Sequence, residues 1–156
     1  SIDLGDNGLT PSIDDIQVEV REGSTRGLEF APFDTEPASF EQYLGQPLVI
    51  NFFAQWCVNC VTEMPEFETV AQEMLDDVTF VGISIDDDPA DAQDLVDETG
   101  VTYDVGWAPS EELYAHFQGF SMPTTVFVDA EGDVQRVWSG VLDEDSLRDR
   151  IMEDLL

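Results

Sequence analysis

Lysine is absent from this chain of 156 residues, which carries 35 acidic residues against five arginines and has a formal net charge of −30. Proteins bind phosphate groups through lysine and arginine, so this balance argues against nucleic acid and anionic lipid as partners. The acids are spread along the chain, which favours a solvated acidic surface over a dedicated acidic docking site. Such a surface fits a saline setting or an ordinary exported protein.

Metal ligands are also scarce. The chain has two cysteines, Cys57 and Cys60, and one histidine, His116. A zinc site takes about four ligands, and His116 lies in a predicted helix beside Phe117, where an ordinary packed or surface role is expected. We therefore expect no metal and no separate cofactor.

Long apolar runs are missing as well. The longest, residues 48–54, is interrupted by Asn51, whereas a membrane-spanning helix needs roughly 20 apolar residues. No signal-peptide pattern is present, and the chain begins at Ser1 rather than at methionine. We therefore expect that any targeting segment or membrane anchor has been removed from this sequence.

The remaining pattern alternates strands and helices and predicts one α/β domain over residues 28–156, after an N-terminal extension over 1–27 that contains an edge strand. The continuous apolar run at 47–54 is typical of a central strand covered on both faces. Further strands are expected at 16–20, 27–34, 78–85, 102–107, 124–129 and 134–139. Helices are expected at 38–45, 57–75, 89–100, 110–120 and 143–156.

Both cysteines lie in the stretch "QWCVNC", between the predicted central strand and a helix. A structural disulfide usually closes a longer loop, because a four-residue loop gives little entropic stabilisation. A Cys-x-x-Cys at a helix start is instead a redox arrangement, since the unpaired N–H groups and the positive dipole end favour a thiolate at Cys57. Cys60, one turn further, is expected to be shielded and to resolve a mixed disulfide. Trp56 is either a packing aromatic or a residue that faces the substrate.

The stretches "VINFFAQWCVNCVTEMPEF" and "SMPTTVFVDAEGDV" resemble the thioredoxin superfamily, specifically its TlpA/ResA/DsbE-like thiol-disulfide oxidoreductases. The resemblance covers residues 28–154. It implies a thioredoxin-like fold, a central mixed β-sheet flanked by helices, with the β-α insertion of TlpA-like members supplied by residues 78–100. It also implies that Pro65 lies inside the helix after the cysteines.

The same resemblance assigns roles to individual residues. Cys57 takes the position of the nucleophile and Cys60 that of the resolving cysteine. Pro123 falls on a proline that is cis in this fold and lies beside the dithiol, which leaves the Met122 backbone open to pair with an extended substrate. Glu63 matches an acid that tunes the thiol pKa, although a surface acid on the same helix face is the alternative. Asn51 stands where thioredoxin has a buried aspartate, and it either tunes the site or only hydrogen-bonds the core.

The resemblance implies an enzyme outside the cytoplasm, periplasmic or at the cell surface, whose redox-active disulfide exchanges electrons with protein thiols or disulfides. Reduction in a role like cytochrome c maturation is the first expectation, and oxidation or isomerisation of folding proteins the alternative. We expect a monomer served by a membrane or soluble electron donor or acceptor. A peroxidase is disfavoured because the motif P-x-x-x-T-x-x-C is absent, and a redox-silent binding module because both cysteines are kept.

Overall fold

The computed structural model describes residues 29–32, 38–85, 88–107 and 122–156. The predicted N-terminal extension with its strand at 16–20 and the predicted helix at 110–120, which contains His116, lie outside these residues. Those two expectations, and the domain boundary at residue 28, therefore stay predictions.

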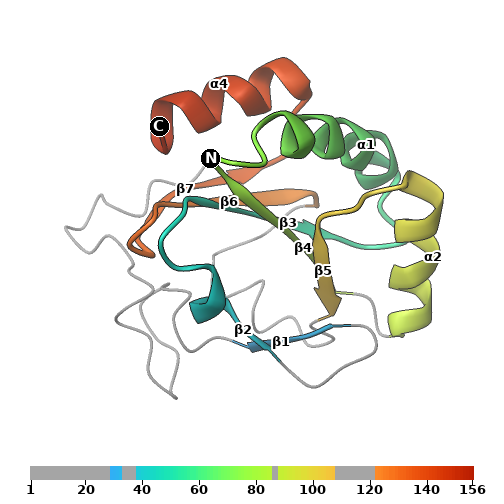
Figure 1. The fold of residues 1–156 in the computed structure, drawn as a ribbon. Coiled ribbons are helices and arrows are strands. Elements are labelled where there is room, and N and C mark those ends of the chain that lie inside the picture. Colours follow the sequence, from blue (N-terminus) through green and yellow to red (C-terminus); the bar gives the residue numbers. More distant parts are fainter. Residues whose placement is uncertain (1–28, 33–37, 86–87, 108–121) are drawn as a thin grey trace.

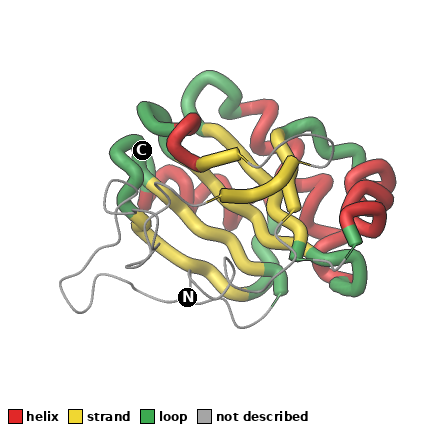
Figure 2. The backbone as a smooth tube through the Cα atoms, turned by 90° about the horizontal axis from the view of Figure 1, so that it is seen from below, coloured by secondary structure: helices red, strands yellow, loops and turns green. Residues whose placement is uncertain are grey.

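The described strands form one mixed seven-stranded sheet in the order β2-β1-β5-β4-β3-β6-β7. β3 pairs in parallel with β4 and antiparallel with β6, so it lies inside the sheet. Figure 2 shows the strands of the sheet side by side. The strands are β1 (Glu29–Pro32), β2 (Ala38–Ser39), β3 (Leu48–Phe53), β4 (Thr79–Ser84), β5 (Asp104–Trp107), β6 (Thr124–Val128) and β7 (Val134–Ser139).

Helices α1 (Val58–Glu73) and α4 (Glu144–Asp154) lie together on one face of this sheet, and α2 (Pro89–Thr99) connects β4 to β5 (Figure 1). A short 3₁₀ helix, Phe40–Tyr43, precedes β3 and occupies part of the predicted helical stretch at 38–45. The expected thioredoxin-like arrangement, a central mixed sheet flanked by helices, is confirmed. Within the described residues, no helix is both long enough and apolar enough to cross a membrane.

The helix ends follow the sequence signals. Asp88 caps α2, its side chain accepting a hydrogen bond from the Ala90 N–H at 2.9 Å, and Pro89 occupies the first turn. Gly100 ends α2 with φ of +74°, a left-handed conformation that glycine adopts at little cost. Asp143 caps α4 by accepting from the Ser146 N–H.

Two apolar clusters hold the layers together. One lies beneath α1 and α4, where Phe67 and Val70 of α1 and Leu147 and Ile151 of α4 pack with Val49 of β3. The other gathers β3, β4 and β6 around Ile50, Phe52 and Ile83 and includes both cysteines. Every residue of β3 is buried, as expected for a strand covered on both faces.

Residues 78–100, which are predicted to supply the β-α insertion, contain β4 and α2. Of the residues 78–100 assigned to it, β4 pairs with β3 along its whole length and lies in the centre of the sheet. The β-α pair is therefore part of the central sheet, in keeping with a segment inside the fold. Its strand is apolar enough to be buried, which is why it takes a central position.

Candidate active site

The two cysteines lie where the central strand passes into α1. β3 ends at Phe53, and a tight turn, closed by a 3.1 Å hydrogen bond from the Cys57 N–H to the Ala54 carbonyl, leads into the helix. Cys57 and Cys60 form a disulfide with their Cα atoms 5.3 Å apart. The predicted redox pair is thus close enough to make and break its bond without moving the backbone far.

Cys57 is the N-cap residue of α1, and its Sγ accepts a hydrogen bond from the Cys60 N–H at 3.2 Å. The first turn of α1 contains no acidic residue, so no carboxylate opposes the positive end of the helix dipole there. These donors favour negative charge on Cys57 when the disulfide is open. Cys57 is 5% exposed and Cys60 is fully buried, which agrees with the predicted roles of attacking and resolving thiol.

Two large apolar side chains flank the disulfide on the outside. Trp56 is 67% exposed, so it does not serve as a packing aromatic. Val58 is 79% exposed, and sequence reasoning had not singled it out, because a variable position between two cysteines carries no signal of its own. Exposed apolar side chains beside a reactive group are a surface on which another chain can pack.

The Met122–Pro123 peptide bond is cis, as the resemblance implied. Phe52 of β3 pairs with Thr124 of β6, so Pro123 lies at the end of the sheet from which the chain runs on to Cys57. Met122 is partly buried and packs against the apolar cluster that contains both cysteines. The sheet therefore brings segments 65 residues apart in the sequence to the same end of the molecule.

Glu63 is fully buried, so the alternative of a surface acid is wrong. Its Oε1 accepts a 3.0 Å hydrogen bond from Asn51 Nδ2, and its Oε2 accepts a 2.8 Å bond from the Leu142 N–H. Burial raises the pKa of Glu63 to about 8, although these two hydrogen bonds act in the opposite direction and lower it. Beside the closed disulfide, Glu63 is therefore mostly a neutral acid at neutral pH.

Sequence reasoning missed two groups around Glu63. The Leu142 N–H comes from the loop between β7 and α4, 79 residues further along, and a backbone donor leaves no mark in a sequence. Tyr103 comes from the segment before β5; its hydroxyl is buried, and the charge of Glu63 contributes to raising its pKa, after burial itself. Asn51 carried the one visible signal, a polar residue inside an apolar strand.

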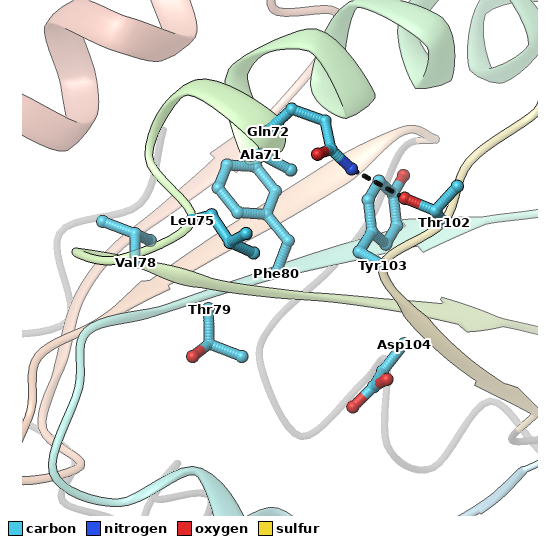
Figure 3. A pocket seen from close by; sticks show the side chains of 9 residues that line it. All are labelled: Ala71, Gln72, Leu75, Val78, Thr79, Phe80, Thr102, Tyr103 and Asp104. Atoms are coloured by element: carbon cyan, nitrogen blue, oxygen red, sulfur yellow. Dashed lines mark hydrogen bonds between the residues drawn. The ribbon is translucent and has the colours of Figure 1, made fainter.

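No site for a metal was found among the described residues, where no three metal-binding side chains gather. A pocket of about 210 Å³ lies at the other end of α1, lined by that helix, β4 and the segment before β5 (Figure 3). Its lining residue Ala71 is 14 positions from Cys57, roughly 20 Å along a helix. The pocket is therefore separate from the dithiol.

Known proteins resemble this chain in sequence and in fold. The chain is 29% identical over 104 residues to the thiol-disulfide oxidoreductase ResA of Oceanobacillus iheyensis, a match covering 66% of this chain and 54% of ResA. It is 30% identical over 108 residues to the thiol:disulfide interchange protein DsbE of Pseudomonas fluorescens biotype C, covering 69% and 59%. The chain thus spans little more than half the length of these curated relatives.

Among solved structures, MTB DsbF in its mixed oxidised and reduced forms superposes with a TM-score of 0.74 at 27% identity, covering 88% of this chain and 98% of that one. Fold, cysteine pair and relatives together define the class, that of thioredoxin-like proteins of the ResA and DsbE thiol-disulfide oxidoreductase type. Residues 27–137 match the AhpC/TSA family, and the chain belongs to this family.

Proposed function

We propose that Cys57 and Cys60 are the working dithiol of an enzyme that reduces disulfides of other proteins. The observation that carries the proposal is the disulfide at the start of α1, with the more exposed cysteine, Cys57, at the helix N-cap. In the reduced enzyme, the Cys57 thiolate bonds to one substrate sulfur and the other sulfur leaves as a thiolate. Cys60 then attacks Cys57 Sγ and releases the second substrate sulfur, so two electrons pass to the substrate.

Glu63 is proposed to accept the proton of Cys60 in the second step. The two residues are one turn apart on the buried face of α1. The pKa of Glu63, about 8, is close to the ordinary thiol value of about 8.5. Transfer of a proton between groups of matched pKa costs little free energy in either direction, which suits an enzyme whose cysteines cycle between thiol and disulfide.

The surface around the dithiol is proposed to receive an extended segment of the substrate. Trp56 and Val58 offer apolar contacts on one side, and the Met122–Pro123 segment offers its backbone on the other. A substrate chain that pairs with that backbone gains main-chain hydrogen bonds without any demand on its sequence. Such recognition fits an enzyme that acts on cysteines in several protein settings.

The resemblance to TlpA/ResA/DsbE-like proteins supports further proposals about setting. The chain acts outside the cytoplasm, tethered or free, as a monomer that receives electrons from a membrane or soluble donor and reduces protein disulfides in a role like cytochrome c maturation. A reduction potential near −270 mV, as in thioredoxin, would support this direction. A value near −120 mV would instead make the protein an oxidant of folding chains.

The experiment that tests the chemistry uses the two serine variants. Cys57→Ser is expected to abolish reduction of insulin by dithiol, while Cys60→Ser is expected to accumulate a mixed disulfide with the substrate. Because the chain has only two cysteines, mass spectrometry after brief alkylation at mild pH reports directly which thiol reacts first. Faster labelling of Cys60 would reverse the assigned roles. Consumption of peroxide without insulin reduction would replace the proposal with a peroxidase.

A further inference from the structure

We propose that Asn51 positions the Glu63 carboxyl group in both of its protonation states, donating a hydrogen bond from Nδ2 to the carboxylate and accepting one at Oδ1 from the carboxylic acid. The inference rests on the proton-acceptor role proposed above for Glu63 and names the residue that keeps it in place through a catalytic cycle. Asn51 touches neither sulfur in this scheme, so it acts through Glu63.

The contacts of the buried carboxyl group lead to this assignment. Asn51 is 1% exposed and Glu63 is fully buried, so water does not surround either side chain. One carboxyl oxygen, Oε2, faces the Leu142 N–H at 2.8 Å, and the other, Oε1, faces the Asn51 amide at 3.0 Å. Asn51 Oδ1 is buried, and within the described part of the chain it has no hydrogen-bond partner.

The two partners of Glu63 differ in what they can do when it takes up a proton. A backbone N–H only donates, so Leu142 holds Oε2 as an acceptor in both states. The acid proton therefore belongs on Oε1, where it faces an amide. Rotation of that amide by about 180° exchanges Nδ2 and Oδ1 without changing its shape, and replaces a donor with an acceptor. The unpartnered Oδ1 supplies that acceptor.

An aspartate or an apolar residue at position 51 would lack this property. An aspartate would place a second titrating carboxyl group against Glu63, and the two would titrate as a coupled pair. A leucine would offer neither donor nor acceptor, and a buried acid proton without a partner is costly. A carboxamide is neutral and offers both groups.

The surroundings of Glu63 contain few other groups that titrate. Neighbouring positions of the sheet are neutral: Asn51 pairs with Gly82 on β4 and with Thr125 on β6. A Cβ built on Gly82 would lie 3.1 Å from the Tyr103 ring, so Tyr103 covers the sheet beside Asn51. The ionisable groups near Glu63 on its own helix are Cys57, Cys60 and Glu66. From other elements come Tyr103, before β5, and Glu144 of α4, whose N–H donates to Glu66. On α2, the described acids Asp94, Asp97 and Glu98 are exposed.

The first test needs no variant. In the oxidised full-length protein, a carboxyl ¹³C titration followed by NMR gives the midpoint of Glu63, and the side-chain amide of Asn51 is followed in the same samples. We expect the chemical shifts of the Asn51 Nδ2 protons to change at the pH at which Glu63 titrates. At the same pH, these protons should lose one set of nuclear Overhauser contacts and gain another, because the amide rotates. An amide that does not respond, or that shifts while keeping its neighbours, would overturn the two-state role.

Variants separate positioning from packing. Asn51→Leu removes a hydrogen bond that is stronger to the charged than to the neutral acid, so the Glu63 midpoint is expected to rise by roughly half to one pH unit. The pH profile of mixed-disulfide resolution should move upward with it. Thr125→Val is the matched control, because it removes a buried polar group from the residue that pairs with Asn51 in the sheet. It should leave the Glu63 midpoint and the pH profile unchanged.

Two further variants keep the outcomes distinct. Tyr103→Phe removes the buried hydroxyl of Tyr103. If the Asn51 amide then no longer responds, the Tyr103 hydroxyl and not Asn51 accepts the hydrogen bond of the Glu63 acid proton. Glu63→Gln should abolish the response as well. If Glu63→Gln resolves mixed disulfides like the wild type, the proton-acceptor role of Glu63 fails, while the NMR titration still decides whether Asn51 positions it. An unmoved midpoint in a folded Asn51→Leu would overturn the proposal.

Discussion

Helix α1 carries four glutamates, and two of them, Glu63 and Glu68, have surroundings with opposite effects on their charge. Glu63 faces the sheet beneath the dithiol, and burial raises its pKa to about 8. Glu68 lies beside the pocket at the other end of α1, where burial also disfavours its charge. Hydrogen bonds from the Thr102 N–H at 2.7 Å, the Thr102 hydroxyl and Gln72 outweigh this effect and lower the pKa of Glu68. Hydrogen-bond donors, and not depth alone, decide which acid stays charged.

This difference separates the chemical from the structural end of one helix. Two donors leave the buried Glu63 with a pKa in the range where thiols titrate, so it can exchange protons with them. Four hydrogen bonds, from the Thr102 N–H and hydroxyl, from Gln72 and from the Tyr103 backbone, favour the charged form of Glu68 and tie α1 to the segment before β5. The Gln72–Thr102 contact beside the pocket is drawn in Figure 3. A carboxylate held charged suits a tether, and a pKa near 8 suits a proton acceptor.

The largest effect is expected at Glu63. Its folded-state pKa lies above the unfolded value, so its contribution to stability is complete below about pH 4.5 and is lost as pH rises through about 8. Glu63→Gln removes this dependence, because glutamine does not titrate. Relative to the variant, the oxidised wild type should lose about 3–5 kcal/mol between pH 5 and pH 8.5.

Urea unfolding of both proteins over that pH range measures the difference. The many other acids contribute equally to both proteins and cancel in the comparison. Parallel stability curves would show that Glu63 reaches water, and its assigned role as proton acceptor would lose its basis. Asp77→Asn, at an exposed acid just past the end of α1, is the charge-matched control and should follow the wild type.

The dithiol and the order of most elements follow from the sequence, because each depends on neighbouring residues, whereas the cis Met122–Pro123 bond is implied by the family resemblance. The position of Cys57 predicts a helix start, the apolar run of β3 predicts a central strand, and Pro89 and Gly100 predict the two ends of a helix. The state of Glu63 does not follow, since its burial depends on α4 and its second donor comes from Leu142. The resemblance supplied a role for Glu63, but its neutral form needed the three-dimensional arrangement.

The next effect concerns the acids that are not buried. A net charge of −30 repels itself across the surface, and added salt shortens the screening length from about 10 Å at 0.1 M to about 3 Å at 1 M. The melting temperature should rise by several degrees from millimolar to molar sodium chloride, mostly at the low end. The loss of stability due to Glu63 between pH 5 and 8.5 should persist in high salt, because buried groups are screened less.

The shape of the salt curve distinguishes two settings. Screening alone is nearly complete at molar salt, so a melting temperature that keeps rising there would favour a protein adapted to a strongly saline environment. A flat curve throughout would show that the acids are spaced too widely to repel, and the inference of a saline setting would be wrong.

The smallest effect is expected at Glu68, and its sign is opposite to that at Glu63. A lowered pKa gives stability that is present above the unfolded value and is lost as pH falls through the folded one. Glu68→Gln keeps one acceptor for the Thr102 N–H but loses the charge, so it should cost about 1 kcal/mol at pH 7, a figure that allows for its partial exposure. The cost should shrink toward zero at a second, acidic pH below the folded-state pKa of Glu68, where the wild-type carboxylate is itself protonated. Urea unfolding at the two pH values measures it, with Thr102→Val as the partner variant: if the two acids differ because of their donors, the effects of Glu68→Gln and Thr102→Val at pH 7 should be less than additive. Additive effects would mean that Glu68 acts through the general field of the surface, and the contrast between the two ends of α1 would then rest on burial alone.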